Sequence, residues 1–229
     1  MLGKVCAFGI PILGNKFSDT GYVDDSNRCD FDPKNRLVTS SRDGYLRLYS
    51  SASDNFSLVT KSNAPGGLEP LATVFSPTGD KIAVGFVGST KVNVLDGHDL
   101  KFLYAPNTTA GIAQGDLGIV AWSQDGNSLY AGGTYDGGSF GPLILHWSQA
   151  GKGNYTEWQA STDVIVGIHS LKNGGIIYGT GNPTFAVLDN MGIKIMEQET
   201  SIIDYRGMLF RKGIQKQNYN KPSPLPAKT

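Results

Sequence analysis

The sequence is poor in the residues that usually carry redox or metal chemistry. Among its 229 residues there are two cysteines, Cys6 and Cys29, and three histidines. Two cysteines are too few for a disulfide framework, so we expect reduced, partly buried thiols, with a single bridge as the alternative. The histidines His98, His146 and His169 are isolated in the sequence, with no carboxylate at ligand spacing. The sequence therefore predicts no zinc site and no other metal or cofactor.

The chain also lacks an excess of charge and a long apolar run. Lys+Arg and Asp+Glu are both 20, so the formal net charge is zero. Binding to nucleic acid or to an anionic membrane would call for a basic surface, so we predict neither partner. No apolar run approaches the ~20 residues of a membrane helix. The short N-terminal run is broken by Gly9 and Pro11 with no cleavage site after it, so we interpret Val5–Leu13 as a strand and expect a cytoplasmic protein.

What the sequence has in abundance is glycine, 30 residues in all, and a fourfold repeat. Each repeat holds a large ring side chain, a turn, an apolar strand, a second turn and an alternating strand. The repeats start at Phe31, Phe75, Trp122 and His169, so the spacings are 75−31 = 44, 122−75 = 47 and 169−122 = 47 residues. A period of about 40–45 residues with four short strands per unit is typical of a propeller blade. We therefore predict an all-β propeller.

Four complete blades are predicted, at about 29–70, 71–116, 117–163 and 164–200. A partial unit is expected at 201–210, and the basic, Pro-containing tail 211–229 is predicted to be disordered. Two architectures stay open. In the first, Val5–Leu13 pairs with Ile202–Phe210 in a composite blade that closes a five-bladed ring. In the second, the chain is a fragment of a larger propeller and leaves a strand edge unpaired.

The repeats resemble the units of the WD-repeat (WD40) family. The sequences Phe75-Ser76-Pro77-Thr78-Gly79 and Trp122-Ser123-Gln124-Asp125-Gly126 match the turn that opens such a unit, and DGYLRLY at 43–49 matches the hairpin that follows. The Trp-Asp pair that names the family is degraded, for example to Trp147-Ser148. The resemblance covers about residues 29–205. Within it the chain is similar to divergent bacterial WD-repeat chains. It implies blades without the family's best-known hydrogen-bond network.

The resemblance also implies a function, namely a non-catalytic scaffold that binds a protein or peptide partner. In WD-repeat proteins one face is formed by the loops between second and third strands and by the loops that enter each blade, and loops often carry function. Carried onto this sequence, that face comprises Arg42, Glu69, Asp116, Tyr135, Asp136, Phe140, Asp163 and Asn182. Aromatic and Arg side chains dominate interface energetics, so Arg42, Tyr135 and Phe140 are the leading candidates. The alternative for each residue is an ordinary solvated loop position.

Catalysis has less support in the sequence, and we predict that the protein is not an enzyme. The sequence Gly137-Gly138-Ser139-Phe140-Gly141 matches G-x-S-x-G, but a nucleophile elbow requires a helix after the turn, and a hairpin loop is expected here. One alternative function is a propeller-type hydrolase or lactonase with its site in the central channel. Such enzymes need a cluster of carboxylates and histidines that the inner strands do not show. Another alternative is a truncated propeller without independent function.

Overall fold

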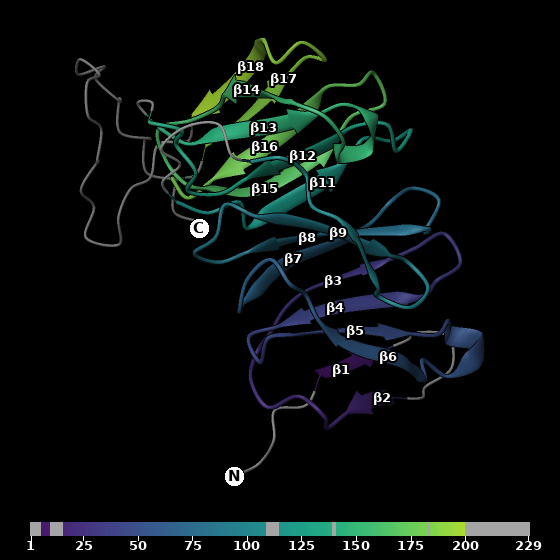
Figure 1. The fold of residues 1–229 in the computed structure, drawn as a ribbon. Coiled ribbons are helices and arrows are strands. Elements are labelled where there is room, and N and C mark those ends of the chain that lie inside the picture. The colour runs from purple at the N-terminus through teal and green to yellow at the C-terminus, as the bar shows by residue number, and fades with distance from the viewer. Residues whose placement is uncertain (1–5, 10–15, 109–114, 139–140, 183, 200–229) are drawn as a thin grey trace, which may run out of the picture.

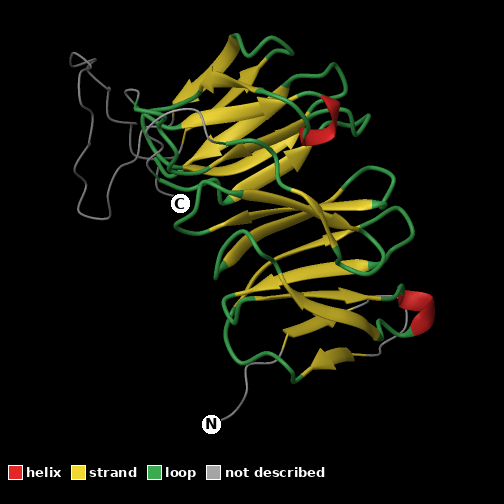
Figure 2. Cartoon of the chain, viewed as in Figure 1, coloured by secondary structure: helices red, strands yellow, loops and turns green. Residues whose placement is uncertain are grey.

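The chain is built almost entirely of strands. The computed structural model describes residues 6–9, 16–108, 115–138, 141–182 and 184–199. These residues form strands β1 to β18 and two short 3-10 helices, η1 (Ala52–Asp54) and η2 (Gln149–Gly151) (Figure 2). All strands except β1 and β2 belong to four antiparallel four-stranded sheets. The predicted all-β fold of blade-like sheets is confirmed.

Each sheet is a meander of four consecutive strands. Sheet 1 contains β3 (Ser26–Phe31), β4 (Leu37–Ser41), β5 (Tyr45–Tyr49) and β6 (Leu58–Asn63). Sheet 2 contains β7 (Pro70–Phe75), β8 (Lys81–Phe86), β9 (Val92–Asp96) and β10 (Phe102–Tyr104). Sheet 3 contains β11 (Ile119–Trp122), β12 (Leu129–Gly132), β13 (Leu143–Trp147) and β14 (Tyr155–Gln159). Sheet 4 contains β15 (Ile165–Ser170), β16 (Ile176–Thr180), β17 (Thr184–Leu188) and β18 (Lys194–Glu199).

The sheets stack face to face in sequence order, and their first strands lie together on the inside. Figure 1 shows successive layers that run from the β1–β2 hairpin at one end to sheet 4 at the other. Strand β3 contacts β7, β7 contacts β11, and β11 contacts β15. Arg28 of β3 also reaches the first strand of sheet 4, where its Nη2 donates to the carbonyl oxygen of Val166 at 2.9 Å. The first strands therefore surround a common interior.

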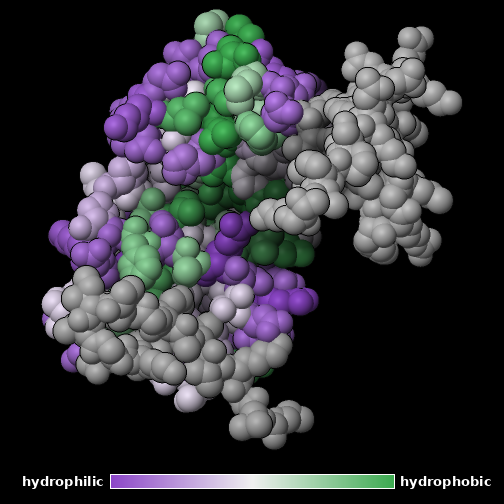
Figure 3. Space-filling view, turned by 180° about the vertical axis from the view of Figure 1, so that it is seen from behind, coloured by the Kyte–Doolittle hydropathy of each residue, from purple (hydrophilic) through white to green (hydrophobic). Residues whose placement is uncertain are grey.

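Each pair of neighbouring sheets encloses its own hydrophobic core. Between sheets 1 and 2, for example, Val38 and Leu48 pack with Ile82 and Leu95, all fully buried. Separate clusters join sheet 2 to sheet 3 and sheet 3 to sheet 4. Side chains alternate between the two faces of a strand. Sheets 2 and 3 each have a neighbour on both sides, so each supplies one row of side chains to each of the two cores that it borders. Seen from behind, apolar residues form a band along the stack with hydrophilic residues beside it (Figure 3).

The four sheets share one register, and this register corrects the repeat alignment at His169. The pairs that close the hairpin between first and second strands are Phe31–Leu37, Phe75–Ile82, Trp122–Leu129 and Ser170–Ile176. The aromatic position of sheet 4 is therefore occupied by Ser170. His169 lies one residue earlier, pairs with Ile177 and is exposed. A one-residue offset turns a side chain to the opposite face of a sheet, so His169 is not a packing residue of the core between sheets 3 and 4.

One position of the second strand shows how closely the sheets approach one another. The equivalent residues, each three positions after the pair that closes the hairpin, are Ser40, Gly85, Gly132 and Gly179. A Cβ atom on Gly85 would collide with the carbonyl oxygen of Leu117 in the chain entering sheet 3. A Cβ atom on Gly179 would meet nothing among the described residues within 4 Å. The far face of sheet 4, where Phe185 is 37% and Met196 45% exposed, is therefore uncovered by the part of the chain that the structure describes.

The N-terminal region differs most from the prediction. Within the predicted strand Val5–Leu13 the structure describes β1 (Cys6–Gly9), which pairs with β2 (Lys16–Asp19), a segment predicted to be a loop. Strand β3 begins at Ser26, ahead of the predicted blade start at about residue 29, because its sequence SNRCDF carries a single aromatic. Cys29 in β3 is exposed, which corrects the expectation of a partly buried thiol. The partial unit 201–210, the tail 211–229 and the C-terminal half of the composite blade lie outside the described residues.

A buried polar network explains the DGYLRLY sequence of sheet 1. Asp43 lies in the β4–β5 turn, and Arg47 lies four residues later on β5, so the two side chains meet. Their side chains are 0% and 1% exposed, and they form a fork with Nη2–Oδ2 at 2.6 Å and Nη1–Oδ1 at 3.1 Å. The guanidinium also donates to the carbonyl oxygen of Gly21 at 2.8 Å and lies 3.8 Å from the ring centroid of Tyr22. This network fixes the segment after β2 against sheet 1.

Candidate functional site

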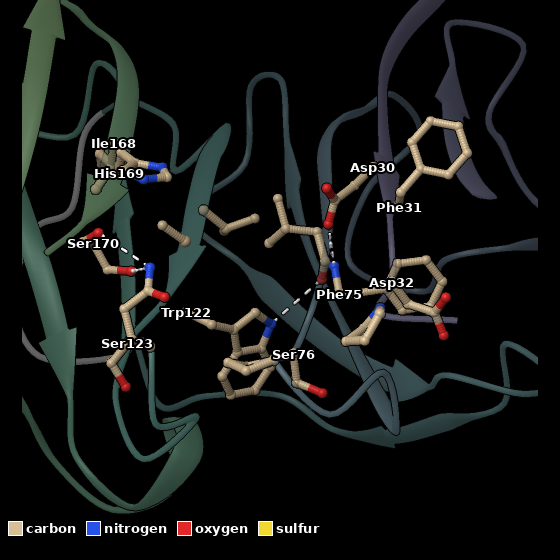
Figure 4. A pocket seen from close by; sticks show the side chains of 16 residues that line it. Asp30, Phe31, Asp32, Phe75, Ser76, Trp122, Ser123, Ile168, His169 and Ser170 are labelled. Carbon is tan, nitrogen blue, oxygen red and sulfur yellow. Dashed lines mark hydrogen bonds between the residues drawn. The ribbon is translucent and has the colours of Figure 1, made fainter. Parts of the chain in front are cut away.

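The ends of the four first strands surround one pocket of about 450 Å³. Its walls come from the last residues of β3, β7, β11 and β15 and from the turns that follow them (Figure 4). Four of the lining residues occupy equivalent positions, one in each sheet: Asp30, Val74, Ala121 and His169. We call this cavity the mouth pocket. It exists because the repeat places the same strand end of every sheet at the same point.

Two carboxylates lie in the mouth pocket, and their surroundings differ. Asp32 is buried and accepts hydrogen bonds from the amide and the Nε of Arg36, at 2.7 and 2.8 Å. Asp30 accepts one from the amide of Phe75 at 2.8 Å (Figure 4). Burial raises the pKa of Asp30, the amides of Phe75 and Phe31 partly offset this, and the charge of Asp32 adds to the rise, so the pKa lies above its ordinary value. Asp32 thus has a cation beside it, while Asp30 is held by neutral amides.

Hydrogen bonds between sheets fix the remaining polar groups of the mouth pocket. The indole Nε1 of Trp122 donates to the carbonyl oxygen of Val74 at 3.4 Å. The side-chain Nε2 of Gln124 donates to the carbonyl and hydroxyl oxygens of Ser170, at 3.3 and 3.1 Å. Both contacts are drawn in Figure 4. These hydrogen bonds join sheet 3 to sheet 2 and to sheet 4, and so they hold the walls of the pocket in place.

The residues predicted from the WD-repeat resemblance, as far as the structure describes them, lie at the opposite end of the first strands. Strand β3 ends at the mouth pocket and begins beside Arg42, whose amide donates to the carbonyl oxygen of Asp25 at 2.8 Å. Arg42 and Glu69 form an ion pair between sheets 1 and 2, with Nε–Oε1 at 3.1 Å and side chains 53% and 30% exposed. We call this the loop end of the molecule. The structure brings these two predicted residues together on one exposed surface.

Two other predicted residues close turns. Oδ1 of Asp116 accepts from the amide of Thr134 at 3.1 Å, and Oδ2 of Asp163 accepts from the amide of Asn182 at 2.8 Å. In both cases the carboxylate lies in the segment that enters a sheet and holds the turn between its second and third strands. A carboxylate that accepts a backbone amide in a turn has a local structural role. Asp116, Asp163 and Asn182 therefore take part in contacts that hold the turns of the repeat.

The prediction that Tyr135 presents its ring to a partner is corrected. Its side chain is 0% exposed, packs in the core between sheets 2 and 3, and donates from its hydroxyl to Oε1 of Glu157 at 3.0 Å. Burial first, and then the hydrogen bonds with Tyr155 and Glu157, raise the pKa of Tyr135. Asp136 is half-buried and accepts from the amide of Gly138 at 2.9 Å. Phe140 lies outside the described residues.

Apolar side chains that the sequence reasoning missed lie around the Arg42–Glu69 pair. Val23 is 83%, Leu68 93% and Val87 39% exposed. The amide of Val23 donates to Oδ2 of Asp43 at 3.4 Å, and the amide of Val87 donates to the carbonyl oxygen of Glu69 at 3.0 Å. Val23 is thus held at the turn that follows Arg42, and Leu68 and Val87 lie beside Glu69, one next to it in sequence and the other through a hydrogen bond. The signal in the sequence was an isolated apolar residue inside a polar loop.

We call this surface the loop-end patch and define it by its five residues. They are Val23, Arg42, Leu68, Glu69 and Val87.

His146 has two hydroxyl groups beside its ring. His146 is half-buried, which lowers its pKa; its Nε2 lies 3.0 Å from the Ser128 hydroxyl and its Nδ1 lies 3.3 Å from the Thr156 hydroxyl. A catalytic base beside a nucleophile is oriented by a third group. If Ser128 were the nucleophile and His146 the base, that third group would be the hydroxyl of Thr156. Among the described residues no group of three or more His, Cys, Asp or Glu side chains could hold a metal ion. None of the described helices is long and apolar enough to cross a membrane.

No family model matches this chain, and no curated protein matches it at the significance applied.

Proposed function

We propose that this protein is a WD-repeat-like propeller array that acts as a non-catalytic scaffold and binds a protein or peptide through the loop-end patch. The proposal includes a cytoplasmic location, since two cysteines provide no disulfide framework of the kind that secreted domains use. The far face of sheet 4 is uncovered by the described residues, with none of their atoms within 4 Å of a Cβ at Gly179, and this supports an array in which a further element packs on sheet 4. The observation that carries the proposal is the exposure of Leu68.

The loop-end patch does little for the stability of the fold. An exposed ion pair such as Arg42–Glu69 contributes about 0–1 kcal/mol, and Leu68 buries almost none of its surface. Exposed apolar side chains on one surface with an Arg are typical of protein-interaction sites. The neighbouring ion pair would supply polar contacts at the rim of such an interface. A protein or peptide with an apolar side chain to bury is therefore the partner that this surface fits.

The test compares capture of partners by two variants with equally drastic changes. Leu68→Asp places a charge in the loop-end patch, whereas Met191→Asp does the same at a residue that is 73% exposed in the β17–β18 turn. Immobilised wild type and Met191→Asp should capture the same proteins from a cell extract, and Leu68→Asp should lose at least about tenfold of that signal, as truncated interface hot spots do. Melting curves should be unchanged for both variants. Equal capture by all three chains would refute the proposal.

A further inference from the structure

The mouth pocket carries polar side chains at two of its four equivalent positions, and one of them is a carboxylate. The four equivalent positions around it carry Asp30, Val74, Ala121 and His169, so one sheet contributes a carboxylate where the next two contribute apolar side chains. The frame of the pocket needs only a side chain that fits there. Asp30 and His169 lie on opposite sides of the cavity in Figure 4. The carboxylate of Asp30 is therefore not needed to build the pocket.

The described residues that line the pocket supply no cation to balance the charge of Asp30. They include two carboxylates and no Lys or Arg. Arg36 neutralises Asp32, with Nη2–Oδ2 at 2.8 Å, and its other contacts go to the carbonyl oxygens of Gly79 and Gly97, each at 2.6 Å. A carboxylate removed from water without a cation beside it is unfavourable. A cation entering the pocket would relieve that desolvation and the repulsion from Asp32.

The other walls suit the rest of such a ligand. Val74, Ala121 and Ile168 offer apolar surface, and Phe31 and Trp122 offer aromatic surface, with Phe31 47% exposed. Aliphatic stems pack on apolar walls while their charged ends reach a polar group, and aromatic faces attract cations. A volume of about 450 Å³ lies within the range of small-ligand sites. The walls and the charge therefore select an organic cation on an apolar stem.

We propose that the mouth pocket binds an alkylammonium group, as at the end of a lysine side chain, with Asp30 as its counter-ion. This site is separate from the loop-end patch, because the two lie at opposite ends of β3. Binding at one does not require binding at the other.

The experiment uses the full chain labelled with ¹⁵N and three probes. They are the peptide acetyl-Gly-Gly-Lys-Gly-Gly-amide, the same peptide with norleucine in place of lysine, and n-butylammonium chloride. The reporter is the indole N–H signal of Trp122, which lines the pocket. Trp147, which shares a core with Trp122, and Trp158, which lies in the core between sheets 3 and 4, do not line the pocket and serve as internal references. The lysine peptide should shift the Trp122 signal alone, and the norleucine peptide should bind at least about tenfold more weakly, because it lacks the charge-assisted hydrogen bond.

Two variants complete the test. Asp30→Asn keeps an acceptor for the amide of Phe75 but removes the charge, and should weaken the lysine peptide at least about tenfold. Asp99→Asn removes an equal charge from the exposed β9–β10 turn and should leave binding unchanged. Binding of both lysine peptide and n-butylammonium would support a site for any alkylammonium; binding of the peptide alone would support a peptide site. The proposal is overturned if neither binds, if norleucine binds as well as lysine, or if Asp30→Asn has no effect. Leu68→Asp should bind the lysine peptide normally, which separates this result from the fate of the proposed function.

Discussion

The buried Asp43–Arg47 pair should make a large and measurable contribution to stability. Breaking a buried ion pair by removing one partner typically costs about 3–5 kcal/mol, because the other charge is left without compensation. Asp43→Asn leaves the buried guanidinium facing a neutral amide but keeps the turn acceptor that the amide of Tyr45 uses at 3.1 Å. We therefore expect the lower end of that range, about 3 kcal/mol. For a domain of this size such a loss lowers the melting temperature by about 6–12 °C.

The assay is urea unfolding of the wild type and three variants, followed by circular dichroism. Asp43→Asn should lose about 3 kcal/mol, while Asp43→Asn/Arg47→Met should recover part of it, because apolar replacement of a buried pair is often close to neutral. Asp99→Asn breaks a fully solvated pair with Lys101 and should leave the urea midpoint nearly unchanged. A loss below about 1 kcal/mol for Asp43→Asn, or a double variant weaker than the single one, would refute this reasoning.

The effect should also depend on pH, with a sign set by the pKa of Asp43. Burial raises this pKa, but the hydrogen bonds from Arg47, the amide of Tyr45 and Ser41 and the charge of Arg47 outweigh it, so the pKa lies below its ordinary value. The stabilisation is then fully present above the ordinary carboxyl pKa and is lost as the pH falls through the lower pKa of the folded state. The difference between wild type and Asp43→Asn should therefore be complete at pH 7 and shrink in strong acid.

Three further outcomes are expected. Gly85→Ala should destabilise the fold by about 1–3 kcal/mol, because its Cβ would collide with the backbone of sheet 3, whereas the equivalent Gly179→Ala should be neutral or slightly stabilising; equal effects in thermal melts would mean that the far face of sheet 4 is covered. Asp30→Asn should raise the melting temperature at pH 7 and change it little below the ordinary carboxyl pKa, because a raised pKa means that stability is lost as the pH rises through it; no gain at pH 7 would contradict the desolvation of Asp30. Arg42→Glu should lose partner capture without changing the melting temperature by more than about 2–4 °C, and the double variant with Glu69→Arg should regain the ion pair; a large loss of stability in Arg42→Glu would show that the pair is structural.

The repeat was predictable because turn chemistry and apolar runs are local signals. Gly79, Gly126 and Gly174 each adopt a positive φ in the turn between first and second strands, and Gly44 does so in the next turn of sheet 1. Such turns, with the spacing of the ring side chains before them, located the four sheets. Strand β2 and the beginning of β3 were missed because the sequences KFSD and SNRCDF hold too few apolar residues to show a period. Their place in the fold comes from pairing with neighbours, which no local pattern records.

The candidate sites were predictable only in part, for a related reason. Arg42 and Glu69 came from their loop positions, and the structure brings them together. Tyr135 occupies a loop of the same kind, yet its ring turns inward to Glu157, and side-chain direction in a loop cannot be read from a turn pattern. The mouth pocket depends on strand ends about 140 residues apart in sequence, Asp30 and His169, so it exists only once the sheets are stacked.

The most direct measurement of the scaffold proposal is hydrogen–deuterium exchange of the chain alone and in complex with a protein captured by the wild type but not by Leu68→Asp. Bound partner should slow exchange in the loop-end segments around Val23, Leu68 and Val87, and leave the turns of the mouth pocket at the other end unchanged. Slowed exchange confined to the turns after β3, β7, β11 and β15, or no change in the loop-end segments, would contradict the account.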